Sequence, residues 1–322
     1  MKRLASFLFL LAAAVLLWPV ATAKAATFAV APVFPSNQID RASGYLDLRV
    51  TPGSEQTLHI KVQNQTAASH RYQVAVNRAA TSATGVIDYT KHDLPAAKSL
   101  AVNIETLLPA VQTVTVGPHK VATVALRLTV PQTSFAGILL GGIRVQQADG
   151  ADAGQVAYVI GLQLRQTKPL PAPKLRLNQV AATATGSGVT VAAKLENTAA
   201  TIVNDLNVKA AITRVGSTKV VLHRQVSGLR MAPNSVFAFP VALTPTTLAA
   251  GRYEATITAK AGAKTWHFTR RFAVKAAVTQ AATSSTQSPT RHGLALAPWL
   301  VAGLIIVLAG LALGVFYLLS NR

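Results

Sequence analysis

The sequence contains no cysteine and few acidic residues: 11 Asp and Glu stand against 31 Lys and Arg in 322 residues. Without cysteine, the chain has no disulfide bonds, thiolate metal sites or cysteine nucleophiles. Its domains must therefore be large enough for a hydrophobic core alone to stabilise them. The formal net charge of +20 favours anionic partners.

Motifs for catalysis and cofactor binding are also missing. The sequence has no GxSxG, HExxH, P-loop or GxGxxG motif, and its seven histidines form no i,i+2 or i,i+4 pair. Asp149 and Asp152 in ADGADAG suggest a calcium loop, but further ligands are missing and a hairpin turn is the simpler interpretation. We predict a protein with no enzymatic activity, cofactor or metal site.

The first 26 residues have the pattern of a secretory signal peptide. Lys2 and Arg3 precede an uncharged apolar run, which ends in the small residues of ATAKAA. We therefore predict that residues 1–26 direct export and are removed. Export and an anchor in the membrane both argue against a nucleic-acid partner, although strong positive charge often indicates one.

A second apolar stretch lies near the other end of the sequence. Residues 299–319 carry no charge and, as a helix of about 31 Å, match the thickness of a bilayer core. We predict a transmembrane helix over residues 294–319 and a cytoplasmic tail over 320–322, so that a single-pass protein of the cell membrane has its N-terminus outside. The spacing of three glycines favours close helix packing in the membrane: Gly303, Gly310 and Gly314.

Between these ends, apolar and polar residues alternate with a period of two, as in QTLHIKVQN and VTVAAKLEN. Turn residues separate such segments, and only residues 94–107 indicate a helical turn. The pattern predicts an all-β fold of two immunoglobulin-like antiparallel β-sandwich domains in tandem. Each half has a strand that ends in asparagine, at Asn64 and Asn197, which indicates a shared plan.

Three alternating prolines in TKPLPAPK predict an extended linker over residues 167–174. A polar, Ser/Thr-rich stretch later in the chain predicts a stalk. The predicted segments are a first domain over 27–166, a second over 175–277 and the stalk over 278–293.

The positive charge belongs mainly to the second half. Residues 27–165 contain 11 basic and 8 acidic residues, whereas residues 166–276 contain 15 and 3. Such a field suits phosphate-bearing polymers or acidic proteins. The alternative is that the charge only keeps the domain soluble.

Two segments of the first half contain candidate binding residues. PSNQID, residues 35–40, favours a polar corner between strands, and such a corner can also present a ligand site. The glycines of FAGILLGGIRV indicate a bulge or the close approach of a partner. The candidate binding residues are Asn37, Gln38, Tyr45, Asn64, Asp88, Tyr89, Gly141 and Gly142.

Several phrases resemble the WxL-interacting protein family. FAVAPVFPSNQID, GYLDLRVTPGSEQTL and VPQTSFAGILLGGI are similar to its peptidoglycan-binding domain. VAAKLENTAA, RMAPNSVFAFPV and KTWHFTRRF are similar to its host-binding domain. The resemblance covers essentially the whole chain, with one departure at Ser82 in AATSATG, where the family pattern has Asn.

This resemblance implies a non-enzymatic adaptor on a Gram-positive cell surface that binds peptidoglycan and WxL-domain surface proteins. Anionic wall polymers and host extracellular matrix proteins are further candidate partners. Two other functions stay open. A strand-addition chaperone would need an exposed sheet edge. A wall-modifying hydrolase or transferase would need five carboxylates to converge in one cleft: Asp88, Asp93, Glu105, Asp149 and Asp152.

Overall fold

The structure, a computed structural model, describes residues 27–150, 153–154, 156–166, 169–185, 188–242 and 248–275. The predicted signal peptide, stalk, transmembrane helix and tail lie outside these residues, together with Gly303, Gly310 and Gly314. Within the described residues, no helix is long and apolar enough to cross a membrane. The predicted all-β class is confirmed, and the 3-10 helix η1 (Ile104–Leu107) lies where the sequence predicts a helical turn.

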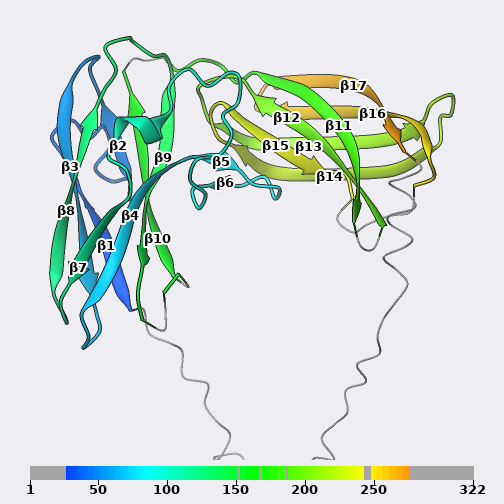
Figure 1. The fold of residues 1–322 in the computed structure, drawn as a ribbon. Coiled ribbons are helices and arrows are strands. Elements are labelled where there is room, and N and C mark those ends of the chain that lie inside the picture. The colour runs from blue at the N-terminus through cyan, green and yellow to red at the C-terminus, as the bar shows by residue number, and fades with distance from the viewer. Residues whose placement is uncertain are drawn as a thin grey trace, which may run out of the picture.

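The first half consists of two sheets packed face to face (Figure 1). One sheet has the order β1 (Phe28–Val33), β3 (Glu55–Asn64), β8 (Val121–Thr129). The other has the order β2 (Leu46–Arg49), β10 (Ala157–Arg165), β9 (Ile138–Gln147), β4 (His70–Arg78), β7 (Gln112–Val116). Alternation places one side chain in two inside, so the two sheets share one apolar core that includes Ile60, Tyr72 and Ile143.

The second half repeats this arrangement. Its sheets have the orders β11 (Leu175–Thr185), β12 (Gly188–Asn197), β15 (Ser235–Pro240) and β14 (Val220–Met231), β13 (Val203–Arg214), β16 (Gly251–Ala261), β17 (Lys264–Val274). A separate core between them contains Phe237, Phe239 and Ile257. Residues 27–275 contain both cores and every strand that the structure describes, so we expect this segment to fold on its own.

Both halves have the same topology. The order β1-β3-β8 corresponds to β11-β12-β15, and β7-β4-β9-β10 corresponds to β14-β13-β16-β17, with the strands in the same chain order. The two asparagines noted in the sequence have equivalent roles. Asn64 and Asn197 are both fully buried, and each amide donates to a carbonyl four residues on, at 2.6 and 2.7 Å. The shared plan is therefore present in side-chain detail as well as in strand order.

Two insertions distinguish the first half. Residues 34–54 separate β1 from β3 and contain β2, and residues 79–111 separate β4 from β7. The second insertion contains η1 and the short hairpin of β5 (Ala80–Thr81) and β6 (Ile87–Asp88). The second half has only residues 186–187 and 215–219 at the corresponding positions.

The strand β2 corrects the prediction that all strands are antiparallel, because it pairs in parallel with β10. A buried polar cluster accompanies this pairing: the Asp47 carboxylate accepts from Gln163 at 2.9 Å and forms an ion pair with Arg165. Asp47 is 3% exposed, so the guanidinium compensates the cost of burying its charge.

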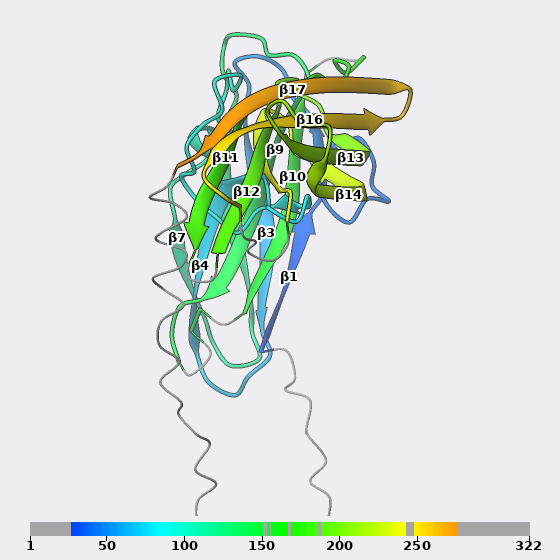
Figure 2. The same ribbon diagram turned by 90° about the vertical axis from the view of Figure 1, so that its right-hand side faces the viewer.

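The β5–β6 hairpin joins the two halves. The Thr81 hydroxyl lies 2.6 Å from the Ser235 hydroxyl, and the Arg230 amide donates to the Gly85 carbonyl at 2.7 Å. Beside it, the Ile138 amide donates to the Ala200 carbonyl at 2.7 Å. A small apolar cluster covers these bonds and includes Ala79, Ile138, Leu140 and Ala232. Figures 1 and 2 show the resulting arrangement, in which most strands of the second sandwich run across those of the first.

Candidate functional site

Two tyrosines from the two insertions lie over paired glycines on the outer face of the five-stranded sheet. Because Ile143 and Val145 enter the core, Gly142 lies on the opposite face of β9, and Gly161 is its direct partner on β10. A Cβ added to Gly142 would lie 2.6 Å from Cγ1 of Val159 and 3.0 Å from Cβ and Cγ of Tyr89. A Cβ added to Gly161 would lie 3.2 Å from Cβ of Tyr45. The missing side chains therefore let both tyrosines lie directly against the sheet.

The backbone on either side holds these tyrosines in place. The parallel register pairs Leu46 with Leu162, which puts Tyr45 beside Gly161. From β4, the Asn77 amide donates to the Tyr89 carbonyl at 2.7 Å, and Asn77 is itself the register partner of Gly142. Both positions thus depend on strand pairing.

We call Tyr45, Tyr89, Val159, Gly142 and Gly161 the tyrosine patch. Tyr45 is 40% exposed and Val159 is 37% exposed, while Tyr89 is half-buried. Within the described part of the chain, neither tyrosine hydroxyl has a hydrogen-bond partner. The patch therefore combines exposed apolar surface with hydroxyls that can donate and accept.

The surroundings of the Tyr89 hydroxyl raise its pKa. Burial raises the pKa of Tyr89, and the nearby Tyr45 raises it further, whereas Arg230 acts in the opposite direction. The net pKa lies above the ordinary value of 10.0, so the hydroxyl keeps its proton at neutral pH. Arg230 comes from β14, so the second half borders the patch.

The polar corner predicted at residues 35–40 supports the patch. Gln38 is 8% exposed, and its side chain donates to the Tyr45 carbonyl at 2.9 Å and accepts from the Asp47 amide at 3.1 Å. Asn37 donates to the Arg49 carbonyl at 2.8 Å. The corner thus fixes the loop that carries Tyr45, while its role as a ligand site stays a prediction.

The other predicted residues lie in different places. Asn64 is fully buried and bonded to backbone, and the Asp88 carboxylate accepts from the Thr90 amide at 2.8 Å. The register of β9 is unbroken through Gly141 and Gly142, so the predicted bulge is wrong and close approach is the reason for the glycines. At Gly141, a Cβ would lie 2.8 Å from the Asn77 carbonyl oxygen of β4 and 3.0 Å from Ile104 of η1.

The carboxylates required for a hydrolase do not converge. Asp149 binds His70 and Arg71 at the start of β4, whereas Glu105 accepts from the Arg78 amide at its end, about 25 Å of strand away. Asp152 lies outside the described residues. Among the residues that are described, no three His, Cys, Asp or Glu side chains gather as a metal site.

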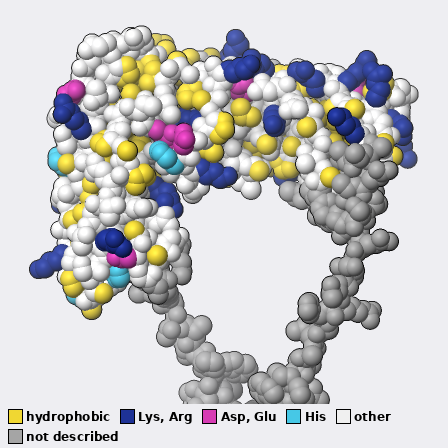
Figure 3. All heavy atoms as spheres, in the orientation of Figure 1, with side chains coloured by type: hydrophobic (Ala, Val, Ile, Leu, Met, Phe, Trp, Pro, Cys, Tyr) yellow, Lys and Arg dark blue, Asp and Glu magenta, His cyan; other side chains and the backbone are white. Residues whose placement is uncertain are grey.

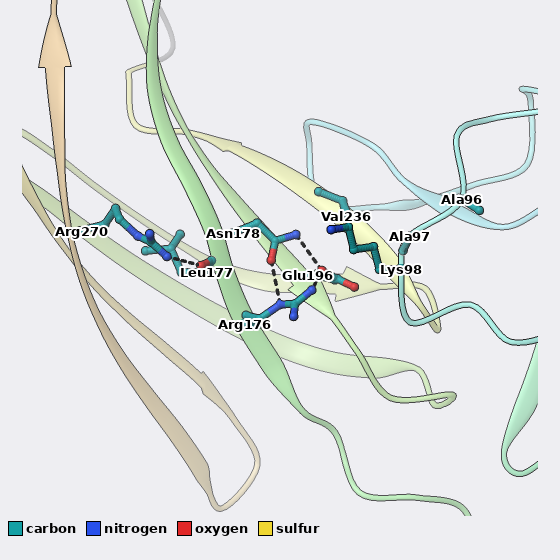
Figure 4. A pocket seen from close by; sticks show the side chains of 9 residues that line it. All are labelled: Ala96, Ala97, Lys98, Arg176, Leu177, Asn178, Glu196, Val236 and Arg270. Atoms are coloured by element: carbon teal, nitrogen blue, oxygen red, sulfur yellow. Dashed lines mark hydrogen bonds and ion pairs between the residues drawn. The ribbon is translucent and has the colours of Figure 1, made fainter.

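A second candidate site, which the sequence did not predict, is a cleft where the two halves meet. This cleft of about 500 Å³ is lined by Ala96, Ala97, Lys98, Arg176, Leu177, Asn178, Glu196, Val236 and Arg270 (Figure 4). At its base, the Glu196 carboxylate is 1% exposed and accepts from Arg176 at 2.6 Å, Asn178 at 2.7 Å and Ser99 at 2.9 Å. Burial on its own raises the pKa of Glu196, but these donors and the Arg176 charge outweigh it and lower the pKa.

This network predicts a pH-dependent contribution to stability. Because the folded pKa of Glu196 lies below its ordinary value of 4.5, its contribution is complete above about pH 4.5 and is lost as the pH falls through the folded pKa. In urea unfolding of residues 27–275, Glu196→Gln should be less stable than the native sequence at pH 7, with a difference that shrinks towards pH 3. Glu254→Gln, at a partly exposed ion pair with Arg271, should show a small difference throughout. A Glu196→Gln difference that is independent of pH would contradict the assignment.

Several residues of the tyrosine patch and of the cleft were not predicted from the sequence. Gly161 interrupts the alternating strand segment AYVIGLQLR. A glycine inside a strand indicates that another part of the chain or a ligand approaches the backbone closely there. No local pattern marks Val159, Arg230 or Arg176, because their neighbours come from distant segments.

Comparisons with known proteins match both halves of the chain. The model of the WxL Interacting Protein peptidoglycan binding domain matches residues 28–147, and that of the host binding domain matches residues 153–284. The chain belongs to the WxL-interacting protein family. The order of the two domains is the family order expected from the sequence. The host-binding model of the family includes β10, a strand that the structure pairs with β9 and β2 in the first sandwich.

Both matched domains of this WxL-interacting protein are described as binding domains, and no enzymatic family is indicated. No curated protein matches the sequence. Solved structures with similarity include the Salmonella enterica SafA pilin in complex with the SafB chaperone, with 12% identity, TM-score 0.31, and coverage of 77% of this chain and 99% of the other. The Acinetobacter baumannii CsuC–CsuE pre-assembly complex gives 14% identity, TM-score 0.31 and coverage of 76% and 98%. Likeness this low carries no argument for the chaperone alternative.

Proposed function

We propose that this protein is a non-enzymatic adaptor of a Gram-positive cell surface, whose first domain binds peptidoglycan through the tyrosine patch. The observation that carries the proposal is the match of residues 28–147 to a peptidoglycan binding domain. Within that range lie Tyr45, Tyr89 and Gly142, while Val159 and Gly161 come from β10.

The chemistry of the patch suits a glycan. Pyranose rings have apolar C–H faces that pack on aromatic side chains, and hydroxyl edges that exchange hydrogen bonds with neutral phenols. The phenol of Tyr45 is exposed, and Val159 extends the apolar surface beside it. Loops held on a rigid sheet commonly carry recognition, and both tyrosines lie on or next to insertions of a shared scaffold.

The second domain, proposed as residues 175–277, would contact host matrix proteins, while the protein as a whole docks WxL-domain surface proteins. The match to a host binding domain and the family name support these partners. Two immunoglobulin-like sandwiches, at 27–166 and beyond the linker 167–174, fit the shared strand order. Export by a signal peptide over 1–26 and anchoring by a helix over 294–319 would hold both domains outside the membrane.

A retention assay tests the proposed binding. Residues 27–275 should be retained on peptidoglycan sacculi stripped of covalently attached anionic polymers, and on immobilised WxL-domain protein. Cellulose serves as the control for non-specific retention by a glycan surface. Passage through both sacculi and WxL-domain columns, or equal retention on cellulose, counts against the proposal.

Topology needs a separate test. In cells whose walls have been digested, protease added outside should remove both domains and leave a membrane-bound fragment of the full chain. Protection of both domains from the added protease would contradict an external location.

A further inference from the structure

Basic side chains surround the cleft at the domain junction. Next to the cleft of about 500 Å³ lies a second hollow of about 320 Å³, lined by Lys98, Ser99, Lys174, Arg176 and Thr198. The two hollows share Lys98 and Arg176. We call them together the junction cleft. Figure 3 shows that Lys and Arg side chains are spread over the second sandwich. Two cations of the junction cleft, Arg176 and Arg270, belong to this sandwich, and Lys174 directly precedes its first strand.

The lining of the junction cleft carries net positive charge. Its cations are Lys98, Lys174, Arg176 and Arg270, and its one acidic residue is Glu196. The Glu196 carboxylate already accepts three hydrogen bonds and is almost inaccessible. Its charge therefore holds Arg176 in position and leaves the other three cations without a carboxylate in the cleft.

The cations differ in how firmly they are placed. Arg176 is fixed by Glu196, and the Arg270 guanidinium donates to the Leu177 carbonyl at 3.1 Å. Figure 4 shows Arg270 reaching this carbonyl from its own strand, while Lys98 enters from the opposite side. Lys98 is exposed and, among the described residues, has no ion-pair or hydrogen-bond partner for its ammonium group. Fixed guanidinium groups facing a free ammonium group suit an anionic ligand between them.

The junction cleft requires both domains. Lys98 and Ser99 belong to the insertion of the first domain, Arg176, Glu196 and Arg270 belong to the second domain, and Lys174 is the last linker residue before β11. The Ser99 hydroxyl donates to Glu196, and its carbonyl accepts from the Asn234 amide at 2.9 Å. These bonds place Lys98 opposite Arg176, so the site is incomplete in either domain alone.

We propose that the junction cleft binds an anionic polymer whose phosphate or carboxylate groups recur along the chain. Two adjoining open hollows that share cations can accept successive charged groups of one chain, whereas a single small anion would contact only part of the lining. This inference does not depend on glycan binding by the tyrosine patch, because the two sites use different residues and different ligand chemistry.

Two charge-matched double variants test the site. Lys98→Gln with Lys174→Gln removes two lining cations, both exposed, so folding should be unaffected. Lys219→Gln with Lys260→Gln removes the same charge at exposed positions outside the lining. In residues 27–275, the first variant should bind inorganic polyphosphate about tenfold more weakly, equal to about 1.4 kcal/mol, and the second should stay within about twofold of the native sequence.

The probes distinguish the chemical sources. Polyphosphate and polygalacturonate carry repeated phosphate and carboxylate groups, and neutral dextran carries neither. Binding of one or both anionic chains that depends on Lys98 and Lys174 supports the proposal and identifies the preferred group. Raising the salt from 0.1 to 1 M should weaken this binding strongly, because the screening length falls from about 10 to about 3 Å. Equal losses in both double variants, binding of neither chain, or equal binding of dextran would overturn the proposal. Retention on stripped sacculi should be unchanged in both variants, so this result is separable from failure of the glycan site.

Discussion

Replacing Tyr45 and Tyr89 together with alanine is expected to weaken retention on stripped peptidoglycan by about 100-fold, because aromatic side chains at the centre of an interface cost about 2 kcal/mol or more when truncated. The two side chains supply all of the aromatic surface of the patch, and Gly142 and Gly161 beneath them have no side chains that could replace it. Affinity is measured by titrating solubilised, polymer-free glycan fragments into residues 27–275.

Control variants separate binding from folding. Val33→Ala with Val121→Ala removes apolar surface that is 38% and 54% exposed on the other sheet of the same domain, and should leave affinity unchanged. Tyr45→Phe with Tyr89→Phe keeps the rings and removes the hydroxyls, so an intermediate loss would separate ring packing from hydrogen bonding. The alanine variant must retain the native thermal unfolding transition. Native affinity in a folded alanine variant would exclude the patch as the binding site.

Gly137→Ala is expected to separate the two domains. Gly137 has a φ of +80°, and a Cβ there would overlap the carbonyl oxygen of Ala200 and lie 2.6 Å from its Cβ. The next residue, Ile138, makes the backbone bond to Ala200, so relief of the clash must break the contact between domains. Because Lys98 would move away from Arg176, polyphosphate affinity should fall about tenfold or more, equal to about 1.4 kcal/mol or more.

Gly216→Ala is the matched control. Its φ is +84°, so alanine there should cost a similar backbone free energy of about 1–2 kcal/mol. No atom lies within 4 Å of the added Cβ, so this variant has no clash. Small-angle scattering should show a larger radius of gyration for Gly137→Ala than for Gly216→Ala or the native sequence. Identical radii and identical polyphosphate affinities for all three proteins would show that the Gly137–Ala200 contact does not hold the domains together.

The two domains illustrate how binding features arise on a repeated scaffold. The strand order and the buried asparagines are shared, whereas Tyr89, Lys98 and the hairpin that joins the domains belong to one insertion of the first domain. Tyr45 belongs to the other. We infer that the common sandwich supplies rigidity and that the insertions supply recognition.

Some expectations failed for a physical reason that sequence patterns do not contain. Parallel pairing of β2 with β10 was not expected, because a strand of four residues shows alternation but not the identity of its partner. The glycines at 141 and 142 indicated either a bulge or close approach. The choice depends on neighbours from other segments, because a Cβ at Gly141 would crowd Asn77 and Ile104, and one at Gly142 would crowd Val159 and Tyr89.

Alternation with a period of two was sufficient to determine the all-β class, because in a strand successive side chains point to opposite faces and only one face enters a core. The family resemblance and the shared asparagine also followed from the sequence alone. Tertiary structure alone decided that Tyr45 and Tyr89 lie over paired glycines and that Lys98 faces Arg176 across the domain junction. Those contacts depend on strand register and domain docking, which are set by the sum of many distant interactions rather than by any local pattern.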